Sequence, residues 1–269
     1  MSGFSADWLA LREPYDVAAR NTPVLDAVAN AFVDQGSIAV VDLACGTGST
    51  LRAIGSHLSP RQTWRVVDND LSLLARASAL GRPPHVTVVA KPVDLARDLE
   101  LALEGLLDLV TTSALLDLVS AEWLDRLIVE AAARRLPVYA ALSYDGRTVL
   151  EPEARFDREV LAGFSLHQRT DKGFGLALGP TAAARAVERF AHFGFAVEQG
   201  RSDWVLASDD RDIQDALFAG WAEVAALTTT LTADEIARWG AERRAALAAG
   251  RSRLRIGHVD IFARPIGSR

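Results

Sequence analysis

The chain has 269 residues, of which 49% are hydrophobic and 7% aromatic, an ordinary composition for a folded globular protein. Lys and Arg number 29 against 35 Asp and Glu, so the formal net charge is -6 and a nucleic-acid groove is disfavoured as the main surface. Cys45 is the single cysteine, which excludes an intrachain disulfide and a cysteine-based zinc site, and no metal site is expected. The sequence has no secretory signal and no uncharged stretch of membrane-spanning length, so we expect a cytoplasmic protein without a membrane partner.

Residues 1–36 predict an N-terminal helical segment in which Pro14 breaks the helix. Short apolar or β-branched runs then alternate with segments long enough for crossover helices. The first five predicted strands are 38–43, 63–68, 86–90, 108–112 and 137–142, and the helices among and after them are 51–58, 71–80, 123–135 and 182–193. This alternation predicts an α/β fold, a doubly wound and mostly parallel sheet of seven strands covered on both faces.

Two insertions interrupt this pattern. Residues 195–206 and 255–263 predict the last two strands, but 207–254 lie between them, with a helix at 212–227 and another opened by a capping box at 232–235. We expect 207–254 to be a helical insertion, followed by the last strand and tail at 255–269. Within the core at 37–206, the glycine-rich and charged segment 145–180 predicts a lid or substrate pocket above the strand ends.

The loop after the first strand carries the strongest chemical signal. Residues 40–49 run from a buried strand into a small-residue turn, where Gly46 and Gly48 let a ligand approach the backbone closely. The dinucleotide fingerprint G-x-G-x-x-G aims helix amides at a pyrophosphate, whereas Asp42 would repel phosphate and favours a ligand with an ammonium group. S-adenosylmethionine (SAM) carries an ammonium group and no phosphate.

Residues 38–119 resemble the class I SAM-dependent methyltransferases of small molecules, which have a Rossmann-like fold. Four segments carry the resemblance, each in the expected order and at a predicted strand end: 42–48, 67–74, 93–95 and 107–117. The first is similar to the family's acidic-x-(Gly or Ala)-x-Gly-x-Gly loop, with Ala44 in place of a commoner glycine. The resemblance implies that SAM is the cofactor and S-adenosylhomocysteine (SAH) the product. The cofactor-binding residues it implies are Tyr15, Arg20, Asp42, Ala44, Cys45, Gly46, Gly48, Asp68, Asn69, Asp94, Leu95, Ser113 and Ala114.

The resemblance also implies individual roles: Asp68 on the ribose hydroxyls, Asp94 and Leu95 on the adenine, and Arg20 on the methionine carboxylate. Simpler interpretations stay open for each. The glycine loop can be an ordinary strand-to-helix turn, Asp68 can cap the next helix, and 93–95 can be a solvated helix start. Tyr15 and Arg20 can belong to a surface helix, and Cys45 can be a small residue packed in the loop.

The acceptor side rests on fewer residues. His167 titrates near neutral pH and is the candidate general base, with Tyr144 as an acceptor-orienting group. Arg147, His167, Arg169 and Lys172 supply positive charge to segment 145–180, which predicts an acceptor with a carboxylate or phosphate. The alternative is a solvated loop without a ligand.

The leading hypothesis is a SAM-dependent methyltransferase, monomer or homodimer, that transfers a methyl group in line to oxygen or nitrogen of a small, anionic metabolite. In this hypothesis, residues 1–36 close over the cofactor. An NAD(P)-dependent oxidoreductase is weakened by the missing G-x-G-x-x-G, and a non-catalytic SAM-binding protein stays open. A nucleic-acid methyltransferase is disfavoured by the charge and by residues 112–115, which replace an Asn/Asp-Pro-Pro-Tyr/Phe motif.

Overall fold

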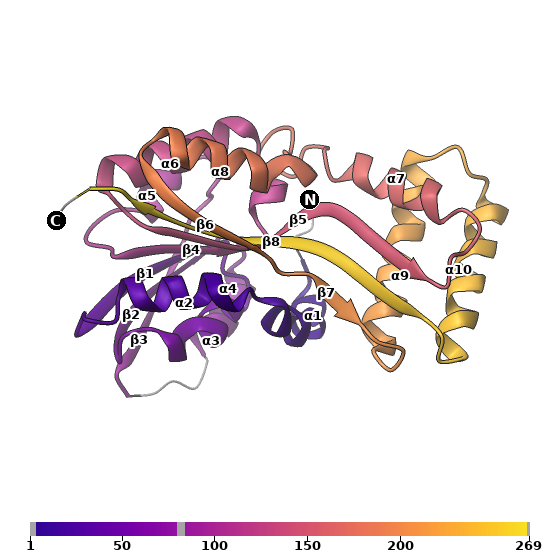
Figure 1. Cartoon of the computed structure of the whole chain (residues 1–269), viewed down its shortest axis with the longest axis horizontal. Helices are drawn as coiled ribbons and strands as arrows, with labels where there is room; N and C mark the ends of the chain where they lie inside the picture. Colours follow the sequence, from indigo (N-terminus) through magenta and orange to yellow (C-terminus); the bar gives the residue numbers. More distant parts are fainter. Residues whose placement is uncertain (1–3, 80–83, 268–269) are drawn as a thin grey trace.

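The computed structural model describes residues 4–79 and 84–267, which form one mixed sheet with helices on both faces (Figure 1). The strand order is β3-β2-β1-β4-β5-β8-β6, and the short β7 pairs with β8. Strands β1 to β5 run parallel, and β8 is antiparallel to its neighbours. The strands are β1 (Ser37–Leu43), β2 (Arg61–Asp68), β3 (Val86–Pro92), β4 (Leu109–Ser113), β5 (Val138–Glu151), β6 (Phe195–Arg201), β7 (Trp204–Leu206) and β8 (Arg253–Pro265). The predicted fold class is confirmed, with β7 added to the seven expected strands.

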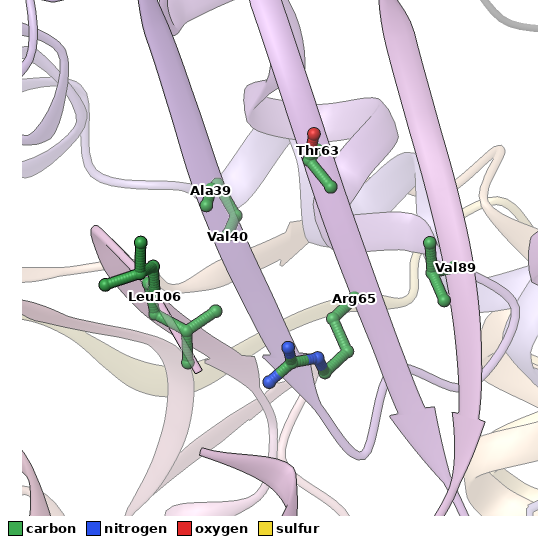
Figure 2. A pocket seen from close by; sticks show the side chains of 7 residues that line it. Ala39, Val40, Thr63, Arg65, Val89 and Leu106 are labelled. Atoms are coloured by element: carbon green, nitrogen blue, oxygen red, sulfur yellow. The ribbon is translucent and has the colours of Figure 1, made fainter. Parts of the chain in front are cut away.

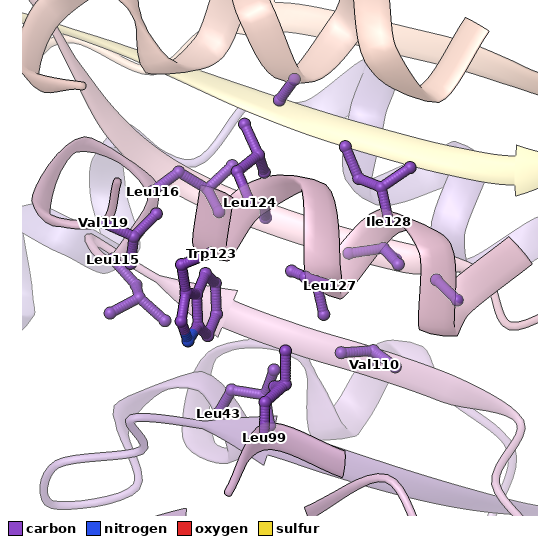
Figure 3. Packing of buried hydrophobic residues seen from close by; sticks show 14 of the residues in the cluster. Leu43, Leu99, Val110, Leu115, Leu116, Val119, Trp123, Leu124, Leu127 and Ile128 are labelled. Carbon is purple, nitrogen blue, oxygen red and sulfur yellow. The ribbon is translucent and has the colours of Figure 1, made fainter. Parts of the chain in front are cut away.

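Helices cover the two faces because alternate residues of a buried strand point in opposite directions. One face carries α2 (Thr22–Ala31), α3 (Ser49–Ile54) and α4 (Leu71–Ser78), and the other carries α5 (Leu99–Ala102), α6 (Ala121–Arg134) and α8 (Ala182–His192). Figure 3 shows the second layer, where Trp123, Leu127 and Ile128 of α6 pack toward β4 and the buried Leu43. Single turns of 3-10 helix complete it at η1 (Gly55–His57), η2 (Leu116–Leu118) and η3 (Gly179–Thr181). Among the described residues, no helix combines the length and apolarity needed to cross a membrane.

Three local predictions were wrong. Helix α1 (Ala6–Ala19) continues through Pro14, and packing of Trp8 and Leu11 against one buried hydrophobic cluster stabilises the helix despite the missing backbone bond. The predicted strand 195–206 is interrupted after β6, where the amide of Ser202 turns to the carbonyl of His258. Strand β5 runs on to Glu151, so the first residues of segment 145–180 belong to the sheet.

The extended halves of β5 and β8 carry a separate layer of helices. Helices α7 (Asp157–His167), α9 (Arg211–Thr228) and α10 (Ala233–Ala248) pack around these strands and β7, beyond the end of the main sheet (Figure 1). We call α7, α9 and α10 the helical subdomain. A Cβ on Gly163 would lie 2.5 Å from the Thr229 side chain, so a glycine lets α7 and α9 approach closely. Residues from both predicted insertions therefore share one hydrophobic core.

A buried ion pair ties this subdomain together. The guanidinium of Arg243 on α10 is fully buried and binds both carboxylate oxygens of Asp157 at the start of α7. Asp157 also accepts a bond from Nε1 of Trp239 at 2.8 Å, and Arg243 donates to the Pro152 carbonyl at 2.8 Å. Every charge in this group is paired, which is the condition under which burial of an ion pair is tolerated.

We expect Arg243→Met to lower the free energy of unfolding by about 3–5 kcal/mol, because it leaves the Asp157 carboxylate buried without its partner. The matched control is Arg244→Met, since the neighbouring Arg244 side chain is 55% exposed and 3.9 Å from Asp215. This control should change stability by less than about 0.5 kcal/mol. Urea unfolding followed by tryptophan fluorescence measures both, and equal losses in the two variants would contradict the assignment.

Candidate functional site

Three residues with left-handed backbone mark the carboxyl edge of the sheet. Ala44 follows β1 with φ 52°, Ala114 follows β4 with φ 52°, and Leu142 interrupts β5 with φ 55°. Residues with a Cβ seldom adopt positive φ, and each instance costs on the order of 1 kcal/mol or more. Such strain persists where the surroundings impose it and gathers at functional sites. The strained residues in these three adjacent strands therefore identify this edge of the sheet as the candidate site.

The glycine loop after β1 is shaped by β2. Gly46 and Gly48 have φ of 53° and 81°, and the amide of Gly46 donates to Oδ2 of Asp68 at 2.9 Å. The other Asp68 oxygen accepts the amide of Asp70 at 3.0 Å. Asp70, not Asp68, caps α4, since its carboxylate accepts the amides of Ser72 and Leu73. The capping alternative for Asp68 is therefore wrong, and its half-buried carboxylate lies against the loop.

Asp42 is the buried charge of this site. Its side chain is inaccessible, Oδ1 accepts the Thr111 hydroxyl at 2.8 Å, and Oδ2 has no hydrogen-bond partner. Burial raises the pKa of Asp42 to about 7, an effect that Thr111 and the charge of Arg20 oppose. A buried carboxylate oxygen without a protein partner is unusual in a folded protein and is a feature to be expected of a ligand site.

Arg20 ends α1 on the same side of the sheet. It is 6% exposed, and it donates from Nη1 to the Tyr139 hydroxyl at 3.1 Å and from Nη2 to Oγ of Ser113 at 3.4 Å. Its Nε is buried without a partner. Tyr139 in turn donates to Asp260 at 3.2 Å, which fixes the guanidinium against β5 and β8. The surface-helix alternative fails for Arg20, which is buried between Ser113 at the carboxyl end of β4 and Tyr139 near the start of β5.

Helix α1 covers the loop with residues that the sequence did not single out. Cδ1 of Leu9 lies 3.1 Å from the place of a Cβ on Gly46, and Glu13 pairs with Arg52, which also binds the Thr47 carbonyl. Tyr15 points elsewhere: its hydroxyl donates to Asp210 at 3.0 Å. Leu9 and Glu13 share a helix face because they are four residues apart, and Tyr15 lies on another face. The expected contact of Tyr15 with the cofactor does not match this geometry.

The remaining predicted cofactor residues lie at neighbouring strand ends. Asp94 is half-buried and its Oδ1 accepts the amide of Ala96 at 3.0 Å, while Asn69 is exposed after β2. Leu95 is 5% exposed and packs in the core, and its carbonyl accepts Nε1 of Trp123 at 2.7 Å. Cys45 is buried, and burial raises the pKa of its thiol, so it is a packed loop residue.

The predicted acceptor residues do not gather at one place. Arg147 binds both Asp145 and Asp203, so its charge is neutralised within the protein. His167 ends α7, where Nζ of Lys172 lies 3.1 Å from its Nδ1, and Arg169 is exposed. No contact in the described part of the chain brings these side chains to Ser113 or Ala114. Tyr144 alone lies near that edge, buried in β5 with its ring centroid 5.6 Å from that of Phe164.

Sequence reasoning missed two buried polar residues beside Tyr144. His258 in β8 is paired in register with Tyr144, and Asp117 lies in η2 just after β4. Asp117 belongs to the fourth motif, but nothing in the motif distinguishes a buried carboxylate from a solvated one. His258 is a lone histidine in a predicted strand, and only the pairing of β5 with β8 reveals its position. We call Asp117, Tyr144 and His258 the strand-end cluster.

Other parts of the molecule offer weaker candidates. Within residues 4–79 and 84–267, no three His, Cys, Asp or Glu side chains are arranged to hold a metal ion. A small pocket lined by Ala39, Thr63, Arg65 and Leu106 lies on the sheet well before the glycine loop (Figure 2). It is mainly apolar and lacks the convergent polar groups of a ligand site.

We expect Asp42→Asn to stabilise the protein at pH 8. The carboxyl pKa rises from 3.8 to about 7 on folding, so stability falls as the pH rises between these values, and an amide escapes this penalty. The expected gain is on the order of 2–4 kcal/mol at pH 8 and smaller at pH 5. Urea unfolding at both pH values measures it, with Asp26→Asn as the exposed control. A gain that is independent of pH would contradict the role given to the buried charge.

No family model and no curated protein matches the chain, but solved structures do. A cyclopropane-fatty-acyl-phospholipid synthase-like protein from Lactobacillus casei is 15% identical, with 97% of this chain and 94% of that chain covered and a TM-score of 0.53. The cyclopropane synthase MmaA2 from Mycobacterium tuberculosis is 11% identical, with 97% and 95% covered and a TM-score of 0.50. The YcgJ protein from Bacillus subtilis is 13% identical, with 92% and 100% covered and a TM-score of 0.50. At these identities the likeness establishes architecture: the chain has the fold of the class I SAM-dependent methyltransferases.

Proposed function

We propose that this protein is a SAM-dependent methyltransferase acting on an oxygen or nitrogen atom of a small molecule. One observation carries the proposal: buried Arg20 and Asp42 each keep an unpaired polar atom at the carboxyl edge of the sheet. These opposite charges suit the carboxylate and ammonium of an amino acid, and SAM ends in that group. A dinucleotide would instead bring phosphates toward the carboxylate of Asp42.

The residues present fit the rest of the cofactor. Asp68 at the end of β2 supplies a carboxylate for ribose hydroxyls, and Asp94 after β3 supplies one for an adenine amino group. Ala44, Gly46 and Gly48 offer a backbone surface with little side-chain bulk. When bound, SAM supplies a methyl group on a positively charged sulfur, which is already strongly electrophilic. The protein then has to align the acceptor and exclude water, tasks that need few catalytic side chains.

Helix α1 supplies the cover for this site. Leu9 lies against Gly46, and Glu13 binds Arg52 in the last turn of α3, so α1 partly covers the loop, in which Gly46 is half-buried. In this proposal, α1 moves aside when a ligand enters along the backbone of Gly46. The exclusion of water that methyl transfer needs is provided when α1 returns.

The charge of the acceptor depends on a few side chains of segment 145–180. An anionic acceptor depends on Lys172 and Arg169, since the charge of Arg147 is taken up by Asp145 and Asp203. The proposal that His167 is the general base also depends on Lys172, because burial and the charge of Lys172 lower the pKa of His167. The proposed acceptor is therefore a small molecule with a nucleophilic oxygen or nitrogen atom. Methylation rates of acceptors that differ only in charge measure which charge the site prefers.

Calorimetric titration with SAM, SAH and NADH tests the cofactor assignment. We expect micromolar binding of SAM and SAH and none of NADH. Asp68→Ala should weaken adenosyl-ligand binding by about 10- to 100-fold, the cost of losing charge-assisted hydrogen bonds. Asp98→Ala is the control, because Asp98 is exposed, also follows β3, and makes no capping bond.

The outcomes separate the alternatives. Binding of NADH without SAM or SAH would overturn the methyltransferase proposal in favour of an oxidoreductase. Equal affinity of Asp68→Ala and Asp98→Ala would remove Asp68 from the site. Tight binding of SAM, with no SAH formed in the presence of any acceptor, would favour a non-catalytic SAM-binding protein.

A further inference from the structure

The strand-end cluster lies where the main sheet meets the helical subdomain. Asp117, Tyr144 and His258 are 4%, 5% and 6% exposed, and they come from η2, β5 and β8. The ring centroids of Tyr144 and His258 are 6.2 Å apart, and the amide of Tyr144 stabilises the Asp117 carboxylate. Asp117 is three residues after the strained Ala114, so the cluster adjoins the edge that carries the proposed cofactor site.

Two atoms of this cluster have no partner. Oδ1 of Asp117 and Nδ1 of His258 are buried and make no hydrogen bond. An unsatisfied buried polar group costs about 1–3 kcal/mol, and native proteins keep few of them. The nearby charged groups are satisfied: Arg12 binds Asp16 at 2.9 and 3.1 Å, and Asp16 accepts Nε1 of Trp204 at 3.0 Å. The neighbouring hydroxyls of Ser143 and Ser202 are also buried without a partner, so Asp117 and His258 are the titratable members of a wider group of unsatisfied polar atoms.

Aromatic rings surround these atoms. His258 lies 5.4 Å from Trp204, Tyr144 lies 5.6 Å from Phe164, and Phe164 lies 6.0 Å from Trp221, measured between ring centroids. A flat apolar body that carries one hydroxyl would match both the rings and the unpaired polar atoms. A purely apolar core would not explain why the carboxylate of Asp117 and the imidazole of His258 lie among these aromatic rings.

The same helix covers this cluster and the glycine loop. Leu9 and Glu13 of α1 face the loop, whereas Arg12 of α1 acts electrostatically on both Asp117 and His258 and stacks 5.0 Å over Trp204. Displacement of α1 would therefore uncover both places together. A cofactor site and an acceptor site must be adjacent and open together for direct transfer between two small molecules.

We propose that the strand-end cluster is the acceptor site, that it binds the hydroxyl of a phenol, and that Asp117 is the general base for that hydroxyl. This rests on the proposed function. The hydroxyl oxygen bonds to the methyl carbon, the carbon–sulfur bond breaks with its electron pair passing to sulfur, and the hydroxyl proton passes to Asp117. His258 and Tyr144 orient the phenol through the imidazole nitrogen and the ring.

The electrostatics suit these roles. Burial raises the pKa of Asp117 to about 6, close to working pH, where a general base is most effective. Burial lowers the pKa of His258 to about 3. The positive charges of Arg12 and Arg147 also lower this pKa, whereas the negative charge of Asp203 raises it. The imidazole is therefore neutral at pH 7 and can accept a hydrogen bond at Nδ1.

Three phenols that share one head group test the proposal: tyramine, 4-hydroxybenzamide and 4-hydroxybenzoate. Binding is followed in SAH-saturated protein by the imidazole NMR signal of His258, assigned with His258→Phe. Turnover is followed by SAH release from SAM. We expect at least one phenol to shift the His258 signal, and Asp117→Asn to lower its methylation rate by about 100-fold or more while the affinity for SAM is kept and the melting temperature does not fall.

The control Asp98→Ala should leave both readouts unchanged. An Asp117→Asn enzyme of wild-type rate, or no phenol-induced shift of the His258 signal in protein that binds SAH, would overturn the acceptor site. If the wild-type protein bound neither SAM nor SAH, the proposed function itself would be refuted.

Discussion

The antiparallel pairing of β5 with β8 is the constraint on which the rest of the molecule depends. Its first part closes the parallel sheet, with Val138 opposite Ala263, and its second part continues past Tyr144 and His258 to Glu151 and Arg253. Both long insertions are attached to this ribbon, one after β5 and one before β8. Pairing of residues more than a hundred positions apart thus decides where the helical subdomain lies and which polar side chains meet.

Local sequence determined much of the core and the strand ends of the candidate site. The positions of the glycine loop, Asp42 and Asp68 at these strand ends were predictable because strand ends, small-residue turns and capping residues are encoded within a few positions. The capping box of α10 is likewise present at Thr232 and Glu235. The acceptor side was not predictable in this way. Arg147 was expected to face a ligand, but Asp203, distant in sequence, neutralises it, and a pattern of charges in one segment cannot reveal a partner in another.

The buried charges of this protein divide into two kinds. Asp157 is fully matched by Arg243 and Trp239, and Asp260 accepts the amides of Asn21 and Leu142, so these carboxylates stabilise structure. Asp42 and Asp117 are each left with one unpaired oxygen and a raised pKa. These two carboxylates lower the stability of the folded protein on the carboxyl side of the sheet, a pattern typical of ligand-binding sites.

Helix α1 is attached at two places, through Glu13 to Arg52 of α3, which follows the glycine loop, and through Tyr15 to Asp210 at the start of α9. In the proposed function, entry of either ligand displaces α1 and breaks both attachments. The second ligand would then meet a chain that is already open and bind more tightly by the free energy of that opening. The two attachments of one helix would therefore couple the two binding events thermodynamically, in addition to the direct contact that methyl transfer requires.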